Sequence, residues 1–167
     1  MGPALALKGV LGGAFSVTVF GIAQVAMDIE PLVQMIRRED ILHGWTHTYI
    51  GATVIGAMVF AAAPAFCSGL LRYWNRQLAQ HRLDWLRSSV AIGRLPAATG
   101  AFIGTFSHVA LDSIMHTDMQ PFAPFATTNR SLYAISITGL HEICVAAGLA
   151  GIALWVWKSW RDRQSSP

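Results

Sequence analysis

The stretch from Ser107 to Phe125 contains the residues most able to do chemistry. His108, Asp112 and His116 follow one another at i, i+4 spacing in an otherwise apolar segment. On a helix, side chains at this spacing project from one face, so the three groups could ligate one metal ion. The second half of the stretch is rich in proline and phenylalanine, which predicts a rigid apolar loop that covers the site.

A second histidine pair, His43 and His47, repeats this spacing and predicts a shared face at the start of another helix. Imidazole and carboxylate donors suit zinc or another borderline divalent ion. The complete set of predicted metal ligands is Asp28, Glu30, His43, His47, His108, Asp112, His116 and His141. Because this set exceeds the needs of one four-coordinate ion, we expect one ion with additional orienting residues, or two ions.

Two further carboxylates, Glu142 and Asp118, are predicted catalytic residues. Either could take the proton of a water molecule activated by the metal ion, as in the hydrolysis of esters, phosphoesters or amides. The sequence has no glycine-rich phosphate loop and no serine nucleophile elbow. Ser107, beside His108, is interpreted as a packing hydroxyl. A metal-dependent hydrolase is therefore the first functional hypothesis.

The composition places these polar groups in an apolar medium. The chain has 167 residues, of which 53% are hydrophobic and 13% charged, about half the charged fraction of a soluble domain. Four segments are long and apolar enough to cross a bilayer, namely residues 7–27, 46–70, 95–116 and 131–157. We therefore predict an all-α polytopic membrane protein, with one transmembrane domain over residues 1–167 and four transmembrane helices. A cleaved signal peptide is the competing interpretation of the first segment, although Gln24 is a poor cleavage signal.

Arginine and lysine are unevenly distributed between the loops. They cluster in residues 72–94 and after residue 157, so the positive-inside rule places these parts and both termini in the cytoplasm. Residues 71–92 are predicted to form an amphipathic helix at the cytoplasmic membrane interface; a solvated connector is the alternative. The net charge of +3 comes from these membrane anchors, so we expect the lipid bilayer as a partner and no nucleic acid.

Depth in the membrane tests whether the polar residues can meet. Pro31 is expected to end the first helix near Asp28, at the outer boundary. His108 and His141 would lie about 13 Å and about 15 Å below that boundary, at 1.5 Å per helical residue. If their helices are antiparallel neighbours, all four helices contribute ligands to one site near the outer surface.

Two other functions remain open. The first is a non-catalytic membrane subunit or interaction protein of a larger complex, in which the His/Asp cluster is a buried polar network or is stabilised by a metal ion. The second is a small metal transporter, but the inner halves of the predicted helices lack the polar residues of a path through the membrane. An ionisable residue inside a membrane is a functional hypothesis by default, which favours the hydrolase.

Three runs of sequence resemble a known family. DIEP (28–31), LHGWTHTYIGA (42–52) and SHVALDSIMHTDMQPFAPF (107–125) are similar to signature segments of a bacterial family described as LexA-binding, inner-membrane-associated, metal-dependent hydrolases, often called YdjM-like. The resemblance covers roughly residues 20–145. It implies a polytopic protein of the bacterial inner membrane, with Asp28, His47, His108 and Asp112 at the family's motif positions. We also expect a lipid or phosphoester as the substrate and other membrane proteins as partners.

Overall fold

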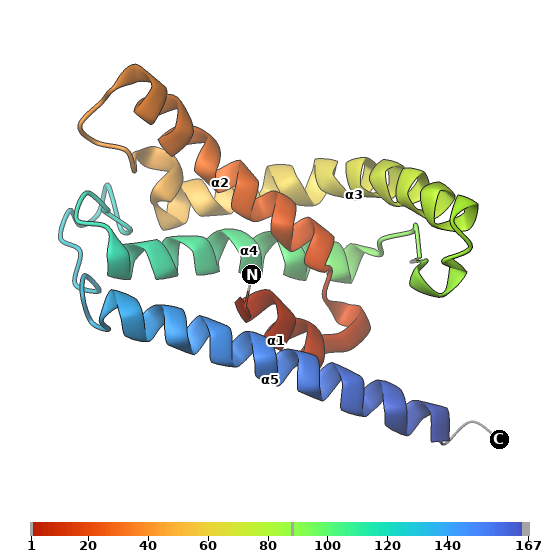
Figure 1. The fold of residues 1–167 in the computed structure, drawn as a ribbon. Coiled ribbons are helices and arrows are strands. Elements are labelled where there is room, and N and C mark those ends of the chain that lie inside the picture. The colour runs from red at the N-terminus through yellow and green to blue at the C-terminus, as the bar shows by residue number, and fades with distance from the viewer. Residues whose placement is uncertain (1, 88, 165–167) are drawn as a thin grey trace.

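The structure, a computed structural model, describes residues 2–87 and 89–164, and these are helical with connecting loops and no strand. The described residues form five α-helices, arranged as in Figure 1, which confirms the all-α prediction. They are α1 (Gly2–Leu11), α2 (Val17–Arg37), α3 (Tyr49–Gln80), α4 (Arg94–Met115) and α5 (Ile137–Gln164). Short 3₁₀ turns occupy Gly12–Ala14, Trp45–His47 and Asp84–Leu86.

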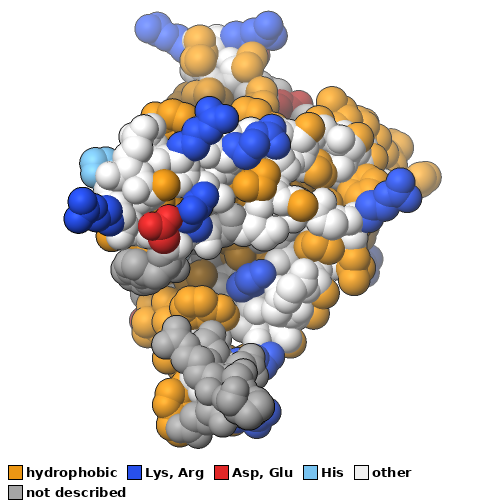
Figure 2. Space-filling view, turned by 90° about the vertical axis from the view of Figure 1, so that its right-hand side faces the viewer, with side chains coloured by type: hydrophobic (Ala, Val, Ile, Leu, Met, Phe, Trp, Pro, Cys, Tyr) orange, Lys and Arg blue, Asp and Glu red, His pale blue; other side chains and the backbone are white. Residues whose placement is uncertain are grey.

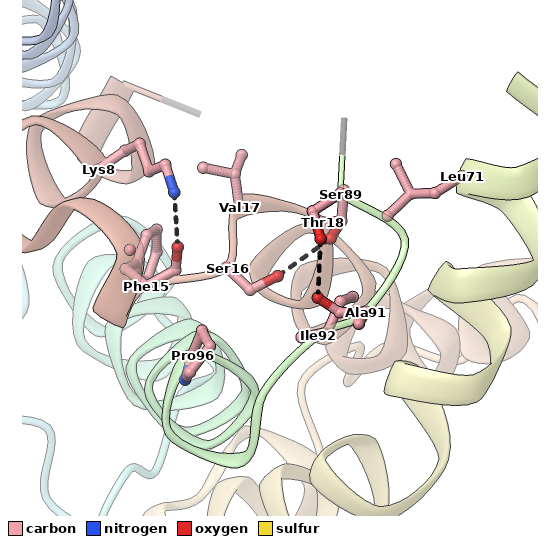
Figure 3. A pocket seen from close by; sticks show the side chains of 11 residues that line it. Lys8, Phe15, Ser16, Val17, Thr18, Leu71, Ser89, Ala91, Ile92 and Pro96 are labelled. Atoms are coloured by element: carbon pink, nitrogen blue, oxygen red, sulfur yellow. Dashed lines mark hydrogen bonds between the residues drawn. The ribbon is translucent and has the colours of Figure 1, made fainter. Parts of the chain in front are cut away.

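The predicted first membrane segment, residues 7–27, is divided between two helices. Gly12 adopts a φ of 55°, a left-handed conformation that glycine tolerates, and this ends α1. The side chain of Ser16 then accepts a hydrogen bond from the Val19 N–H and caps the start of α2. Figure 3 shows the Lys8 ammonium at this turn, where it donates to the Phe15 carbonyl. It donates to the Gly12 carbonyl as well.

Pro31 does not end α2, contrary to our expectation. The helix continues to Arg37, with Pro31 inside it. A single proline removes one backbone hydrogen bond and bends a helix, but neighbouring elements can hold the bent helix together. Asp28 and Glu30 consequently lie within the helix, and both face other parts of the chain.

The predicted interfacial segment, residues 71–92, is also not a separate helix. Its first part continues α3 as far as Gln80, and a loop containing the third 3₁₀ turn follows. In the continuation, Asn75 and Leu78 are buried whereas Tyr73 and Trp74 are exposed, so the amphipathic character is retained. The helix persists because residues 71–80 contain neither glycine nor proline.

α4 lies against both α2 and α3 and forms the centre of the fold. Small residues make this contact possible, since a Cβ on Gly104 would lie 2.7 Å from the Cβ of Ala23 on α2. The buried core between these helices is also built from small and medium side chains, namely Val19, Ala23, Val59, Ala63, Cys67 and Ala101. α4 therefore contacts protein along much of its length.

Among the described residues, three helices are long and apolar enough to cross a membrane. They are Val17–Arg37, Tyr49–Gln80 and Ile137–Lys158. The prediction of four such helices is thus wrong for residues 95–116. α4 contains glycine, threonine, serine, histidine and aspartate, several of them buried, and these residues lower its hydropathy. A helix covered by its neighbours can carry such residues because it exposes less surface to lipid.

α5 packs mainly against α1 rather than against α4. Gly9 and Gly151 meet in this contact, since a Cβ on Gly9 would lie 2.8 Å from the Gly151 carbonyl oxygen. The Lys158 ammonium also donates to the carbonyl of Gly9, at 2.7 Å. α5 is consequently separated from the helices that carry most of the predicted ligands.

Gly151→Ala should destabilise the α1–α5 contact by about 1–3 kcal/mol, the usual cost of overpacking. A Cβ at Gly151 would overlap the backbone of Leu5 and Ala6, which cannot rotate away. Thermal unfolding of the detergent-solubilised chain measures the effect. Gly69→Ala is the matched control, because a Cβ at Gly69 meets no atom within 4 Å and alanine favours a helix. Equal melting temperatures for the two variants would contradict the contact.

The connecting segments gather at two ends of the molecule. Residues 38–48 and 116–136 lie at the left end in Figure 1, beside the C-terminal ends of α2 and α4. Residues 81–87 and 89–93 lie at the opposite end, together with the end of α5. The fold therefore brings the sequence stretches that contain the predicted ligands to one end.

Candidate metal centre

His108 is held in place by a pair of residues on α2. The Gln24 amide nitrogen donates to the Gly104 carbonyl at 2.7 Å, which orients the amide so that its oxygen faces His108 Nδ1 at 3.0 Å. His108 Nδ1 must therefore carry the proton in this bond. Asp28, one turn after Gln24, lies with its Oδ1 3.3 Å from the other ring nitrogen, Nε2. The i, i+4 spacing of Gln24 and Asp28 places them on opposite sides of one imidazole ring.

His47 is oriented by a similar relay. The backbone N–H and the hydroxyl of Thr46 both donate to Glu30 Oε2. With its proton directed at Glu30, the Thr46 oxygen can accept from His47 Nδ1, which is 3.0 Å away. Burial and the neighbouring His108 and His43 lower the pKa of His47 to about 4. His47 is thus neutral near pH 7, as a metal ligand must be.

Asp118 orients His43 in the third such arrangement. It accepts hydrogen bonds from the backbone N–H groups of Leu42 and His43 and from His43 Nδ1, at 2.9–3.0 Å. Burial by itself raises the pKa of Asp118, but these donors outweigh it and lower the pKa to about 2. Asp118 is therefore a charged hydrogen-bond acceptor that fixes the loop of residues 38–48 against the segment after α4.

The four histidines form a row of ring contacts. The ring centroids are 5.2 Å apart for His108 and His47, 4.8 Å for His47 and His43, and 4.3 Å for His43 and His116. The outermost member, His116, is not helical, because α4 ends at Met115 and His116 has an extended backbone. The row therefore runs from the buried His108 to the half-buried His116.

Two ring nitrogens at the buried end of this row lack the partners they need. Neither His47 Nε2 nor His108 Nε2 forms a hydrogen bond with any described residue, although both are buried. Asp112 Oδ2 lies 3.0 Å from His108 Nε2 and 3.7 Å from His47 Nε2, but without hydrogen-bond geometry. Nitrogen lone pairs and carboxylate oxygens so close together repel one another unless a proton or a metal cation lies between them.

The spacing of these donors fits a divalent metal ion. Two donors that each lie 2.0–2.1 Å from a tetrahedral zinc ion are about 3.3 Å from one another. The distances of 3.0, 3.3 and 3.7 Å around His108 Nε2 and Asp112 Oδ2 bracket this value. Residues that hold the Nδ1 proton of each histidine are the usual surroundings of metal-ligating imidazoles. His47, His108, Asp112 and Asp28 thus form a cluster that could hold a metal ion.

Six of the eight predicted ligands come together, in three overlapping groups. These groups are Asp28, His47 and His108; His43, His47 and Asp112; and His43, His116 and Asp118, each with donor atoms within 4.8 Å of one another. The predicted base Asp118 lies in the third group. Glu30 lies in none of the three, because it faces Thr46 behind His47. His43 and His47 do not share a helix face, since α3 begins only at Tyr49.

His141 and the predicted base Glu142 are placed elsewhere. Both are exposed on the first turns of α5 and belong to none of the three groups. The expected match in depth between His108 and His141 required α4 and α5 to be packed neighbours. Because α5 packs on α1 instead, the structure does not bring His141 and Glu142 to the cluster.

The loop after α4 covers the site in part. Met119 and Pro121 are buried, and the Pro121 carbonyl accepts a hydrogen bond from the Tyr49 N–H at the start of α3, at 2.9 Å. Phe125 is instead 87% exposed. The first part of the proline- and phenylalanine-rich segment is thus fixed against the protein, whereas its end faces outward.

Gln24 and Thr46 are site residues that the sequence analysis missed. A signal for Gln24 was present, because it is a polar residue in an apolar helix and precedes Asp28 by four positions. Thr46 had no comparable signal, since its role depends on the meeting of Glu30 and His47 across a loop.

Gln24→Ala should weaken metal binding by about 10–100-fold, as is usual when a residue that orients a metal ligand is removed. Gln24→Glu should retain most of the affinity, because its carboxylate can still accept from His108 Nδ1. Titration of the metal-free chain with zinc in detergent measures both variants. Equal affinities for Gln24→Ala and the wild type would show that the amide does not orient the ligand.

Fold and site together define a class, an all-helical chain with three helices of membrane-spanning length and a buried His/Asp cluster with the donor set of a metal centre. Residues 5–167 match the model of the family described as a domain of unknown function, DUF4184, and the chain belongs to this family. No curated protein and no solved structure matches it.

Proposed function

We propose that this protein is a metal-dependent hydrolase embedded in a membrane, with zinc as its metal ion and a lipid or phosphoester as its substrate. The observation that carries the proposal is the pair of buried, unpartnered nitrogens, His47 Nε2 and His108 Nε2, beside the carboxylate of Asp112. Zinc is preferred because the donors are imidazole and carboxylate and the described site contains no thiolate.

Each residue has a distinct part in this proposal. His47, His108 and Asp112 hold the ion, and Gln24, Thr46 and Glu30 keep the two imidazoles in the required tautomer. A bound zinc ion supplies Lewis acidity that lowers the pKa of an attacking water and polarises the bond to be broken. Asp28 has a side chain that is 63% exposed, so it faces the open side and can take the proton from that water.

Asp118 has a positioning role in this proposal and is not the base. Its two oxygens already accept hydrogen bonds from Leu42 and His43. A carboxylate with its pKa lowered to about 2 is also a weak proton acceptor.

The orientation in the membrane is part of the proposal. Figure 2 shows the end of the molecule opposite the metal cluster, where lysine and arginine side chains are spread over a largely apolar and neutral surface that also carries acidic and histidine side chains. The positive-inside rule favours this end for the cytoplasm. The metal cluster would then lie near the outer face of a bacterial inner membrane. The similarity of the DIEP, LHGWTHTYIGA and SHVALDSIMHTDMQPFAPF runs to the YdjM-like family supports the same location and reaction.

A comparison of metal-loaded and metal-free protein tests the proposed reaction. The purified chain in detergent should hydrolyse a member of a panel of lipid esters, lipid amides and phosphodiesters after zinc is added. It should lose this activity after chelation, and Asp28→Asn should hydrolyse more slowly while it keeps the metal ion. A chain that binds zinc firmly and hydrolyses no member of the panel would instead favour a non-catalytic subunit whose metal ion is structural.

A further inference from the structure

A hollow of about 670 Å³ lies directly beside the metal cluster. Its walls are the loop before α3 and the segment after α4, and it is lined by Ile41, His43, Gly44, Trp45, Thr48, Thr117, Asp118, Met119, Gln120, Ala123, Pro124, Thr127, Asn129 and Leu132. His43 and Asp118, which line the hollow, form a group of possible ligands with His116, and the ring of His43 lies 4.8 Å from that of His47, a ligand of the proposed centre. A molecule in the hollow would therefore have one end at the metal centre.

The lining is poor in charge. None of the described residues around the hollow is a lysine or arginine, and the titratable ones are His43 and Asp118. Arg37 instead lines a separate hollow along α2, together with Glu30 and Thr46. Proteins that bind phosphate groups generally supply arginine, lysine or free N–H groups at a helix N-terminus. The N-terminus of α3 reaches the hollow at Thr48, but its Tyr49 and Gly51 N–H groups already donate to the Pro121 carbonyl and to the Thr48 hydroxyl. The chemistry of this hollow thus fits a molecule without an anionic group.

The charge of the cluster leads to the same conclusion. Four carboxylates lie in and around it, Asp28, Glu30, Asp112 and Asp118. When the imidazoles are neutral, as metal ligation requires, one divalent ion leaves two negative charges uncompensated. An anionic head group would be repelled at this end of the hollow, whereas a neutral ester or amide would not.

The hollow also has apolar walls with exposed side chains. Ile41 and Trp45, which line it, are 61% and 54% exposed, and Phe122 and Phe125 lie exposed on the same loop as Ala123. Exposed apolar side chains around an opening favour contact with lipid, and tryptophan favours the membrane interface. A volume of 670 Å³ is within the usual range for pockets that enclose small molecules, about 300–1,000 Å³.

From this geometry we infer that the hollow binds the hydrocarbon chain of a neutral lipid and presents its uncharged acyl ester or amide bond to the metal centre. The inference rests on the proposed hydrolase function and narrows its substrate class. In the reaction, the oxygen of water bonds to the acyl carbon and the bond from that carbon to the ester oxygen or amide nitrogen breaks. One water proton passes by way of Asp28 to the leaving oxygen or nitrogen, and the fatty acid releases the other to solvent.

Photo-crosslinking tests the site independently of turnover. The full chain in detergent is exposed to a long-chain glyceryl ether with a terminal diazirine, which is neutral and cannot be hydrolysed. A phosphodiester with the same chain and diazirine is the anionic comparison. The neutral probe should label the segment of residues 117–132, and the anionic probe should label it much less.

Filling the hollow provides the matched variant. Ala123→Trp should reduce labelling by the neutral probe to background, because Ala123 lines the hollow. Ala126→Trp should leave labelling unchanged, because Ala126 is exposed and does not belong to the lining. Both variants should keep the wild-type zinc content, which shows that they fold and that the cluster is intact.

The outcomes separate this inference from the proposed function. If the zinc-loaded chain hydrolyses phosphodiesters and the anionic probe labels residues 117–132 as well as the neutral one, the neutral-lipid inference is wrong and the hydrolase stands. If the neutral probe labels the segment but no zinc binds and nothing is hydrolysed, the hydrolase fails although the hollow binds lipid. Equal labelling of the Ala123→Trp and Ala126→Trp variants would overturn the assignment of the hollow.

Discussion

His108→Ala is expected to purify with less than about a tenth of the metal content of the wild-type chain, since a ligand that defines the site is removed. Its Nε2 is buried, lies within 3.3 Å of two carboxylates and has no hydrogen-bond partner among the described residues. No neighbouring side chain can replace it, because the next imidazole, His47, already belongs to the same group. Elemental analysis of detergent-purified protein measures the loss.

Two other histidines serve as controls for this result. His141→Ala changes an exposed residue on α5, outside the three groups, and should keep the full metal content. His81→Ala lies at the opposite end of α3 and should do the same. Far-ultraviolet circular dichroism, which measures helix content, shows whether His108→Ala is folded. A folded His108→Ala with wild-type metal content would refute the assignment of the centre.

Asp112→Asn is expected to be more stable than the wild type without a metal ion and less stable than the wild type with zinc. In the metal-free chain, at a pH at which both imidazoles are neutral, Asp112 Oδ2 faces the Nε2 atoms of His108 and His47, at 3.0 and 3.7 Å, and neither can donate to it. An asparagine amide can donate to His108 Nε2 instead. The variant should gain about 1–3 kcal/mol, the cost of leaving a buried polar group unpaired.

With zinc in excess, the wild type should be more stable than Asp112→Asn. The wild type is stabilised by ligand binding, by about 4 kcal/mol when free zinc is a thousand times the dissociation constant. Asp112→Asn gains little, because it has lost an anionic ligand. Melting temperatures with chelator and with zinc, in the same detergent, measure both halves of the prediction. Asp84→Asn, at the exposed far end of the molecule, should change neither value.

A single result would contradict this account. If Asp112→Asn melts below the wild type in chelator as well as in zinc, the carboxylate stabilises the fold by itself. The cluster would then be a hydrogen-bonded network, which is the structure expected of the non-catalytic alternative.

Local spacing predicted part of the centre correctly. His108 and Asp112 are one turn apart, so any helix brings their side chains together, whatever packs around it. The structure places their donor atoms 3.0 Å apart. The same argument failed for His116, because α4 ends one residue before it. It failed also for His43 and His47, because residues 38–48 form a loop and a 3₁₀ turn before α3 begins.

Arguments from depth were less successful, since they assumed which helices are neighbours. Equal depth for His108 and His141 would bring them together only on adjacent helices, and α5 packs on α1. The close contact of Gly9 with Gly151 decides this pairing. Glycines occur in most of the helices, so the sequence alone does not show which glycines of different helices contact one another; the packing of the helices decides this.

The sequence by itself determined the helical class, the apolar character of the chain and the group of polar residues from which the centre is built. These properties follow from composition and from the period of the α-helix, which are local. Only the tertiary structure decided which residues meet. It added Gln24 and Thr46, gave Glu30 and Asp118 orienting hydrogen bonds and left His141 and Glu142 exposed. The physical reason is that these contacts join residues far apart in the chain, and side-chain packing between helices determines such contacts.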